Sequence, residues 1–129
     1  MDTETALTIQ QVARQTGLSI DTLRYYERIG LLEPVTRTAS GHRRYTRHDL
    51  DSIDLLIRML KTGMPRAQMA RFAHLRRQGP STLAERRHML EEHRRTVEEH
   101  IQELEQHLAA LRDKIARLKE REAEYQTRG

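Results

Sequence analysis

The C-terminal part of the chain is a run of helix-favouring residues with no glycine or proline from Thr82 to Arg128. Apolar side chains recur along it in alternating steps of four and three, which is the heptad pattern of a coiled coil. About 40 helical residues rising 1.5 Å each span roughly 60 Å. Residues 1–81 are too few to cover such a rod, so its apolar stripe requires a partner helix, most simply a second copy of the chain.

The heptad register predicts which residues meet the partner. Arg94 and Glu122 occupy the two outer a positions. The expected dimerisation residues are the apolar a and d residues Leu90, Val97, Ile101, Leu104, Leu108, Leu111, Ile115 and Leu118.

Charges beside the stripe favour an antiparallel pair. The e positions are acidic early, at Glu91, Glu98 and Glu105, and basic late, at Arg112 and Lys119. An antiparallel pair brings e beside e of the second helix, so early glutamates meet late cations. A parallel pair sets g against e and would place His107 against Arg112 and Lys114 against Lys119, although such exposed pairs contribute only ~0.2–1 kcal/mol each.

Residues 8–45 contain two short helical patterns joined by a turn centred on Gly17. Thr8 with Gln11 forms a capping box for the first pattern, and Ser19 caps the second, over residues 20–29. The inner stripe of the second helix is Leu23, Tyr26 and Ile29. From residue 33 to residue 45 helical periodicity is replaced by an extended pattern with a turn near Gly41. Two helices followed by a hairpin are the order of a winged helix-turn-helix.

The residue types in this motif suit DNA. The N-terminal part of the second helix of such a motif enters the major groove, where short polar side chains and an arginine fork can reach base edges or phosphates. Cations clustered on a projecting hairpin suit phosphate contacts. The expected DNA-binding residues are Ser19, Thr22, Arg24 and Tyr25 on the helix and Arg37, His42, Arg43 and Arg44 on the wing, whereas Tyr45 is expected to pack its base.

Composition agrees with a nucleic-acid partner. Residues 1–80 hold 13 Lys/Arg and 8 Asp/Glu, a balance of +5, whereas residues 81–129 hold 10 and 11, a balance of −1. The basic excess therefore lies in the part that carries the motif. The absence of cysteine excludes disulfides and thiolate metal sites. No apolar run reaches membrane length and no signal-peptide pattern is present, so no membrane partner and a cytoplasmic location are expected.

Two further helical patterns separate the motif from the rod. Thr46 is expected to cap a helix that runs to about Thr62, and Pro65 to begin one that runs to Arg77. Thr82 and Glu85 form a candidate capping box for the rod. The expected domains are a winged helix-turn-helix over 7–76, a linker over 77–81, a dimerisation helix over 82–124 and a flexible tail over 125–129. The expected fold class is all-α with a small β-hairpin wing.

Three blocks in order, LSIDTLRYYERIGLLEP, RTASGHRRYTRHDLDSI and KTGMPRAQM, resemble the MerR (mercury-resistance regulator) family of bacterial transcription regulators over about residues 7–76. The resemblance implies a homodimer joined by an antiparallel coiled coil. It also implies binding to near-palindromic promoter DNA, which an effector makes the dimer bend and untwist for RNA polymerase. Arg24 and Tyr25 would then serve the recognition helix and Arg43 the wing, while His42 stands where many members carry Tyr or Phe.

The effector is not identified by the resemblance. Metal- and redox-sensing members use cysteines, which this chain lacks, and drug-sensing members carry a large ligand domain where this chain has only a few residues after the helix. No cofactor or metal site is therefore expected, and a small-molecule effector stays open. His93, His100 and His107 recur at g and are read as solvated flank residues, with a pH sensor or a weak metal site as alternatives. Likewise, Met64, Met69, Phe72 and Met89 are read as core, with an inducer pocket as the alternative.

Three function classes remain in competition. The leading one is a dimeric transcription regulator. The second is a DNA-architecture or recombination accessory factor without effector control, and the third is a coiled-coil interaction protein whose basic domain is incidental. An enzyme is not expected, because no nucleophile set, phosphate-binding loop or metal cluster appears in the sequence.

Overall fold

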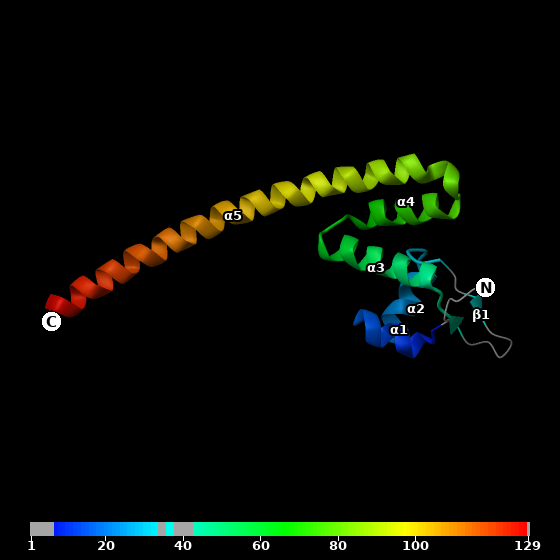
Figure 1. Cartoon of the computed structure of the whole chain (residues 1–129), viewed down its shortest axis with the longest axis horizontal. Coiled ribbons are helices and arrows are strands. Elements are labelled where there is room, and N and C mark those ends of the chain that lie inside the picture. Colours follow the sequence, from blue (N-terminus) through cyan, green and yellow to red (C-terminus); the bar gives the residue numbers. More distant parts are fainter. Residues whose placement is uncertain (1–6, 34–35, 38–42, 129) are drawn as a thin grey trace. The chain divides into compact units, whose positions relative to one another are not determined.

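The computed structural model describes residues 7–33, 36–37 and 43–128 (Figure 1). The chain divides into two compact units, Met1–Met89 and Leu90–Gly129. The mostly helical fold with a small strand pair confirms the expected fold class. Its elements are α1 (Ile9–Thr16), α2 (Ile20–Arg28), β1 (Thr36–Arg37), β2 (Arg43–Arg44), α3 (Arg47–Lys61), α4 (Arg66–Arg77), the 3-10 turn η1 (Pro80–Thr82) and α5 (Leu83–Arg128).

Side-chain caps define where α1 and α3 begin. Thr8 Oγ1 accepts a hydrogen bond from the Gln11 backbone N–H (3.2 Å), and Gln11 Oε1 accepts one from the Thr8 N–H (2.9 Å). Thr46 and Asp49 form the same reciprocal pair at the start of α3. Gly17 follows α1 with a positive φ of 78°, which a glycine adopts without steric cost. The capping and turn residues read from the sequence therefore set these boundaries.

The two strands form a short antiparallel pair. Thr36 is opposite Arg44, and Arg37 is opposite Arg43. Leu7 and Tyr45 extend the ladder through two backbone hydrogen bonds of 2.8 and 2.9 Å. The Tyr45 side chain is buried, as expected for the base of the wing. The expected turn at Gly41 and residue His42 lie outside the described residues.

The core of the N-terminal unit lies where α1 contacts α2 and α3 (Figure 1). Its largest fully buried side chains are Val12, Leu23, Ile53 and Leu56. The predicted core residues Met64, Met69 and Phe72 are buried as well, and Met89 is half-buried. The prediction for Ile29 was wrong: α2 ends at Arg28, so Ile29 leaves the inner stripe and its side chain is 41% exposed.

The predicted capping box of Thr82 and Glu85 is absent, because η1 precedes α5 and Thr82 belongs to it. Thr82 Oγ1 is oriented toward the backbone carbonyls of Leu75 (2.6 Å) and Gly79 (2.8 Å) and cannot cap the helix. Arg86 then donates from Nε to Thr82 Oγ1 and from Nη2 to the Gly79 carbonyl. Glu85 pairs instead with Arg71 on α4.

The long helix continues further than expected. It ends at Arg128, so residues 125–128 are helical where a flexible tail after residue 124 was predicted. Residues 123–126 (AEYQ) contain no helix breaker, and Gly129 is the first glycine after α5 begins. None of the described helices is long and apolar enough to cross a membrane.

Replacing Thr82 with valine should destabilise the fold by about 1–3 kcal/mol, because two carbonyls and the Arg86 Nε–H lose a buried hydroxyl partner. Chemical denaturation at fixed protein concentration measures this change. Thr82→Ser keeps the hydroxyl and should lose less, and Ser81→Ala, at an exposed neighbour, should stay within about 0.5 kcal/mol of the natural protein. Equal stability of the Thr82→Val and Ser81→Ala proteins would contradict the assigned role.

Candidate nucleic-acid interface

Ser19 and Thr22 form a small hydroxyl cluster at the N-terminus of α2. Ser19 Oγ accepts a hydrogen bond from the Thr22 backbone N–H (3.0 Å) and donates its own proton to Thr22 Oγ1 (2.8 Å). Ser19 is therefore occupied in capping the helix, whereas the Thr22 hydroxyl keeps its proton for an outside acceptor. Of the two expected contacts on this turn, Thr22 is chemically the freer.

Tyr25 lies on the outer side of α2 between two arginines from different helices. Its ring lies 5.8 Å from the Tyr26 ring, and the guanidinium of Arg28 lies 5.6 Å from its centroid. Its hydroxyl is 3.5 Å from Nη1 of Arg66, the first residue of α4. The side chain is 37% exposed, so the hydroxyl stands beside two cations at the surface.

The start of α4 makes this cluster more attractive to anions. No side chain caps the helix and its first turn contains no acidic residue. Uncapped backbone N–H groups and the positive end of the helix dipole favour negative charge. The sequence interpretation did not select Arg66 or Arg28 as site residues. The signal for Arg66 was a basic residue directly after Pro65, with no acid in the next turn.

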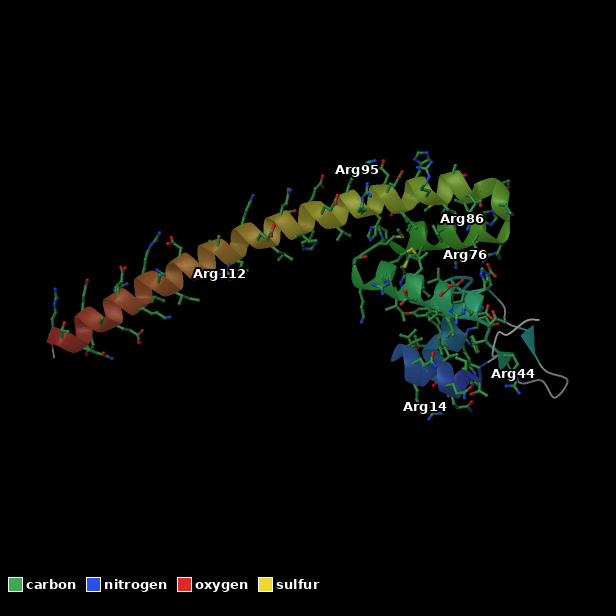
Figure 2. All side chains as sticks on the ribbon, viewed as in Figure 1. Arg14, Arg44, Arg76, Arg86, Arg95 and Arg112 are labelled. Atoms are coloured by element: carbon green, nitrogen blue, oxygen red, sulfur yellow. The ribbon has the colours of Figure 1, made fainter. Side chains whose placement is uncertain are left out.

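The structure describes the side chains of only some of the remaining residues that were predicted to contact DNA. Arg24 is exposed on α2, and Arg44 is exposed on β2 and labelled in Figure 2. Arg37 and Arg43 are opposite one another in the strand pair, but only their backbone is described. His42 lies outside the described residues. The roles of all eight residues in binding DNA stay predictions.

Two arginines at the C-terminal end of α4, Arg76 and Arg77, make contacts outside the cluster around Tyr25. Arg77 Nη1 donates to the carbonyl of Gly30 (3.1 Å), which fixes the turn that follows α2. The Arg76 guanidinium lies 5.2 Å from the centroid of the Phe72 ring and close to the start of α5 (Figure 2). Burial lowers the pKa of Arg76 below its ordinary value, while the Glu33 carboxylate opposes this and the charge of Arg86 adds to it. Of these contacts, the Arg77–Gly30 hydrogen bond joins α4 to the turn that follows α2.

The C-terminal unit presents the predicted dimerisation stripe. Leu90 and Val97 are half-buried, whereas the other six predicted residues expose between 43% and 61% of their surface. The heptad series continues at its far end to Tyr125, which is 81% exposed. Six large aliphatic side chains at helical spacing without cover in one copy are what a coiled-coil surface requires.

The structure offers no support for a metal site. Within residues 7–33, 36–37 and 43–128, no group of three or more His, Asp or Glu side chains could hold an ion. His100 and His107 are exposed and His93 is half-buried, and their solvated-flank, pH-sensor and weak-metal-site interpretations all stay predictions.

The family model described as MerR family regulatory protein matches residues 8–45. HTH-type transcriptional regulator AdhR from Bacillus subtilis is 38% identical over 84 residues, and the match covers 65% of this chain. The match spans only 60% of the length of AdhR, and 62% of an uncharacterized HTH-type transcriptional regulator from Haemophilus influenzae that is also 38% identical.

Solved structures match over a larger share of the chain. The structure of HiNmlR, a MerR family regulator lacking the sensor domain, bound to promoter DNA, has a TM-score of 0.79 and 36% identity, covering 87% of this chain and 89% of that one. A putative MerR family regulator from Listeria monocytogenes has a TM-score of 0.78 and 34% identity, covering 84% and 83%. The chain therefore belongs to the MerR family of transcription regulators, which are not enzymes.

Proposed function

We propose that the protein binds double-stranded promoter DNA as a homodimer and regulates transcription there. The observation that carries this proposal is that side chains suited to DNA contacts lie on three elements of the N-terminal unit. Exposed Arg24 and Tyr25 lie on α2, exposed Arg44 on β2, and Arg66 at the start of α4 beside Tyr25. The solved complex of HiNmlR with promoter DNA, which shares the fold, supports the same assignment.

The α2 residues divide by chemistry into base readers and phosphate contacts. Arg24 carries a planar fork that matches the O6 and N7 acceptors of guanine in the major groove. Thr22, two residues earlier on the same helix, can donate its hydroxyl proton to a base edge or a phosphate. Arg24 is therefore the proposed sequence-reading residue, and Thr22 assists it.

The Tyr25–Arg66 pair is proposed to bind one phosphate. The Tyr25 hydroxyl accepts from Arg66 through a lone pair, so its own proton remains available for a phosphate oxygen. Arg66 has further N–H donors on the same guanidinium, and Arg28 adds charge from the ring side. Contacts of this kind position a protein on the duplex without reading its sequence. The wing arginines 37, 43 and 44 are proposed to bind the backbone in the same way.

The dimer is proposed to form through α5, whose a and d residues need a second apolar surface. Each fully buried Leu or Ile contributes roughly 1.5–3 kcal/mol relative to exposure, so burying the six exposed aliphatic residues of each copy stabilises a dimer strongly. Two DNA-reading units related by a twofold axis then suit a near-palindromic site. We propose that the dimer bends and untwists such a site for RNA polymerase in response to an effector, whose identity stays open.

The dimer should protect a near-palindromic sequence upstream of its own gene or a neighbouring gene. DNase footprinting at low salt, with the oligomeric state checked in the same buffer, measures this. Protection of two half-sites related by a twofold axis supports the proposal. A folded dimer that protects no such sequence contradicts it. In vitro transcription separates a regulator from an architecture factor. A regulator changes the amount of transcript from the promoter, whereas an architecture factor bends the DNA and leaves the amount of transcript unchanged.

Alanine at Arg24 and at Arg66 should have different consequences for binding. Arg24→Ala should cost about 1–3 kcal/mol on the natural site and relax the preference at one base pair. Arg66→Ala should weaken binding to all sequences alike and lower the slope of log K against log salt by about 1. Titrations on the natural site, a mutated site and random DNA at several salt concentrations measure both effects.

Two variants serve as controls for that comparison. Tyr25→Phe keeps the ring between its arginines and removes only the hydroxyl proton, so it should reproduce part of the Arg66 effect. Arg117→Ala removes a cation that pairs with Asp113 on α5 and should leave DNA affinity unchanged. If Arg66→Ala altered the preferred sequence, or if Arg117→Ala weakened binding as much, the phosphate assignment would be wrong.

A further inference from the structure

Two charged residues interrupt the apolar stripe of α5. Arg94 and Glu122 stand at a positions of the heptad series, one on each side of an apolar block that runs from Val97 to Leu118. Both side chains are exposed. They are 28 residues apart in one straight helix, which is about 42 Å at 1.5 Å per residue, so they cannot pair within one copy.

The ion pairs that α5 makes along its own surface involve other residues. Arg95 pairs with Glu92 and Arg117 with Asp113, three and four residues apart on the same copy. Arg94 and Glu122 instead face the direction that the dimer is proposed to bury. A charge at an a position costs stability, but it can fix the register and orientation of a coiled coil when its partner is in place.

We infer that Arg94 of one copy pairs with Glu122 of a second, antiparallel copy at each end of the rod, and that these two pairs restrict the register of the dimer. The inference rests on the proposed homodimer and specifies how its two helices align. The occupant of the stripe is thus a second copy of this chain, selected by charge complementarity as well as by apolar surface.

One antiparallel alignment that matches a positions with d positions brings these two residues together. With the twofold axis near Gln106, Leu108 is opposite Leu104 of the second copy. The next layers outward pair Ile101 with Leu111 and Ile115 with Val97. All these central layers are apolar.

The charged layers follow at both ends of that block. Arg94 is then opposite Leu118 of the second copy, and Leu90 is opposite Glu122 of the second copy. Arg94 and Glu122 of different copies therefore lie one helical turn apart, about 6 Å along the axis. An extended arginine side chain can cover that distance.

A parallel alignment, and an antiparallel slip in one of the two directions, lose this pairing. In a parallel dimer Arg94 would face Arg94 and Glu122 would face Glu122, which places like charges together in two layers. A slip of one heptad in one direction leaves Arg94 and Glu122 of different copies 11 residues, about 16 Å, apart along the axis, whereas a slip in the other direction leaves them three residues, about 4.5 Å, apart. On the flanks Glu91 comes near Lys119 and Glu98 near Arg112 of the second copy, whereas Glu105 comes near its own counterpart, and such exposed pairs contribute little.

Charge reversal in the full-length chain tests the inference. Arg94→Glu and Glu122→Arg should each weaken the dimer on the order of 10- to 100-fold, because each places two like-charged pairs in every dimer. The double variant R94E/E122R should recover most of the lost affinity, since the pairs are restored with their signs exchanged. An equimolar mixture of the two single variants should form mixed dimers in preference to either homodimer. Sedimentation equilibrium and native mass spectrometry measure these affinities.

Matched controls use neighbours that point away from the partner. Arg95→Glu and Glu120→Arg make the same charge changes at b and f positions and should change the dissociation constant less than threefold or so. Helical circular dichroism at high concentration checks that each variant folds. Two results would overturn the proposed pairing of Arg94 with Glu122. One is single variants that dimerise like the controls, and the other is a double variant whose dimer affinity stays as low as that of the single variants.

The same experiment separates this inference from the proposed function. If the natural protein is a dimer that protects a near-palindrome while the charge reversals have no effect on dimer affinity, the Arg94–Glu122 pairing is wrong and the proposed function stands. If the natural protein does not dimerise at all, the proposed function itself fails.

Discussion

The apolar stripe along α5 is the constraint on which the rest of the protein depends. A single helix of 46 residues buries only part of one end against its own chain, and the six central stripe residues remain exposed in one copy. Water makes such a surface costly, so the helix is complete only as part of an assembly. A second copy that covers this stripe would explain two proposed features together. These are the twofold character of the DNA site and the pairing of the charged a residues.

The start of α5 is held rigidly within the N-terminal unit. Thr82 ties η1 to the end of α4 through two carbonyls, Arg86 returns to the same turn, and Arg77 links α4 to the turn after α2. The helix proposed to bind a second copy is therefore connected to α2 through a short series of hydrogen bonds and packed side chains. Such a series can couple the arrangement of the dimer to the position of α2, which is what control of DNA shape requires.

The sequence predicted those features that local chemistry determines. Thr8, Gln11, Ser19 and Thr46 cap helices as expected, because a capping side chain and its target are three residues apart and need no tertiary contact. The heptad positions on α5 were equally local, and their exposure matches the expected stripe. The family resemblance covered about residues 7–76, and the family model matches residues 8–45 of that range.

Predictions from the sequence were wrong where tertiary packing overrides a local pattern. Thr82 and Glu85 have capping-box spacing, yet η1 orients the threonine toward α4 and Arg71 pairs with the glutamate. Arg66 was missed as a site residue because its neighbour Tyr25 lies 41 residues earlier in the chain. Ile29 fits the helical spacing of α2 but follows its last residue. The errors at Glu85 and Arg66 come from contacts between helices, and the error at Thr82 comes from its bonds to the carbonyls of Leu75 and Gly79, none of which periodicity encodes.

Distances between spin labels test the central claim, that α5 pairs with itself in antiparallel orientation, most directly. The chain has no cysteine, so a single Cys at Gln106 or Glu120, both on the outer f face, accepts one label per copy. The antiparallel dimer predicts roughly 20 Å between labels at 106, about two helix diameters, and about 45 Å between labels at 120. A pair of distances near 20 Å at both positions would show a parallel dimer and contradict the account.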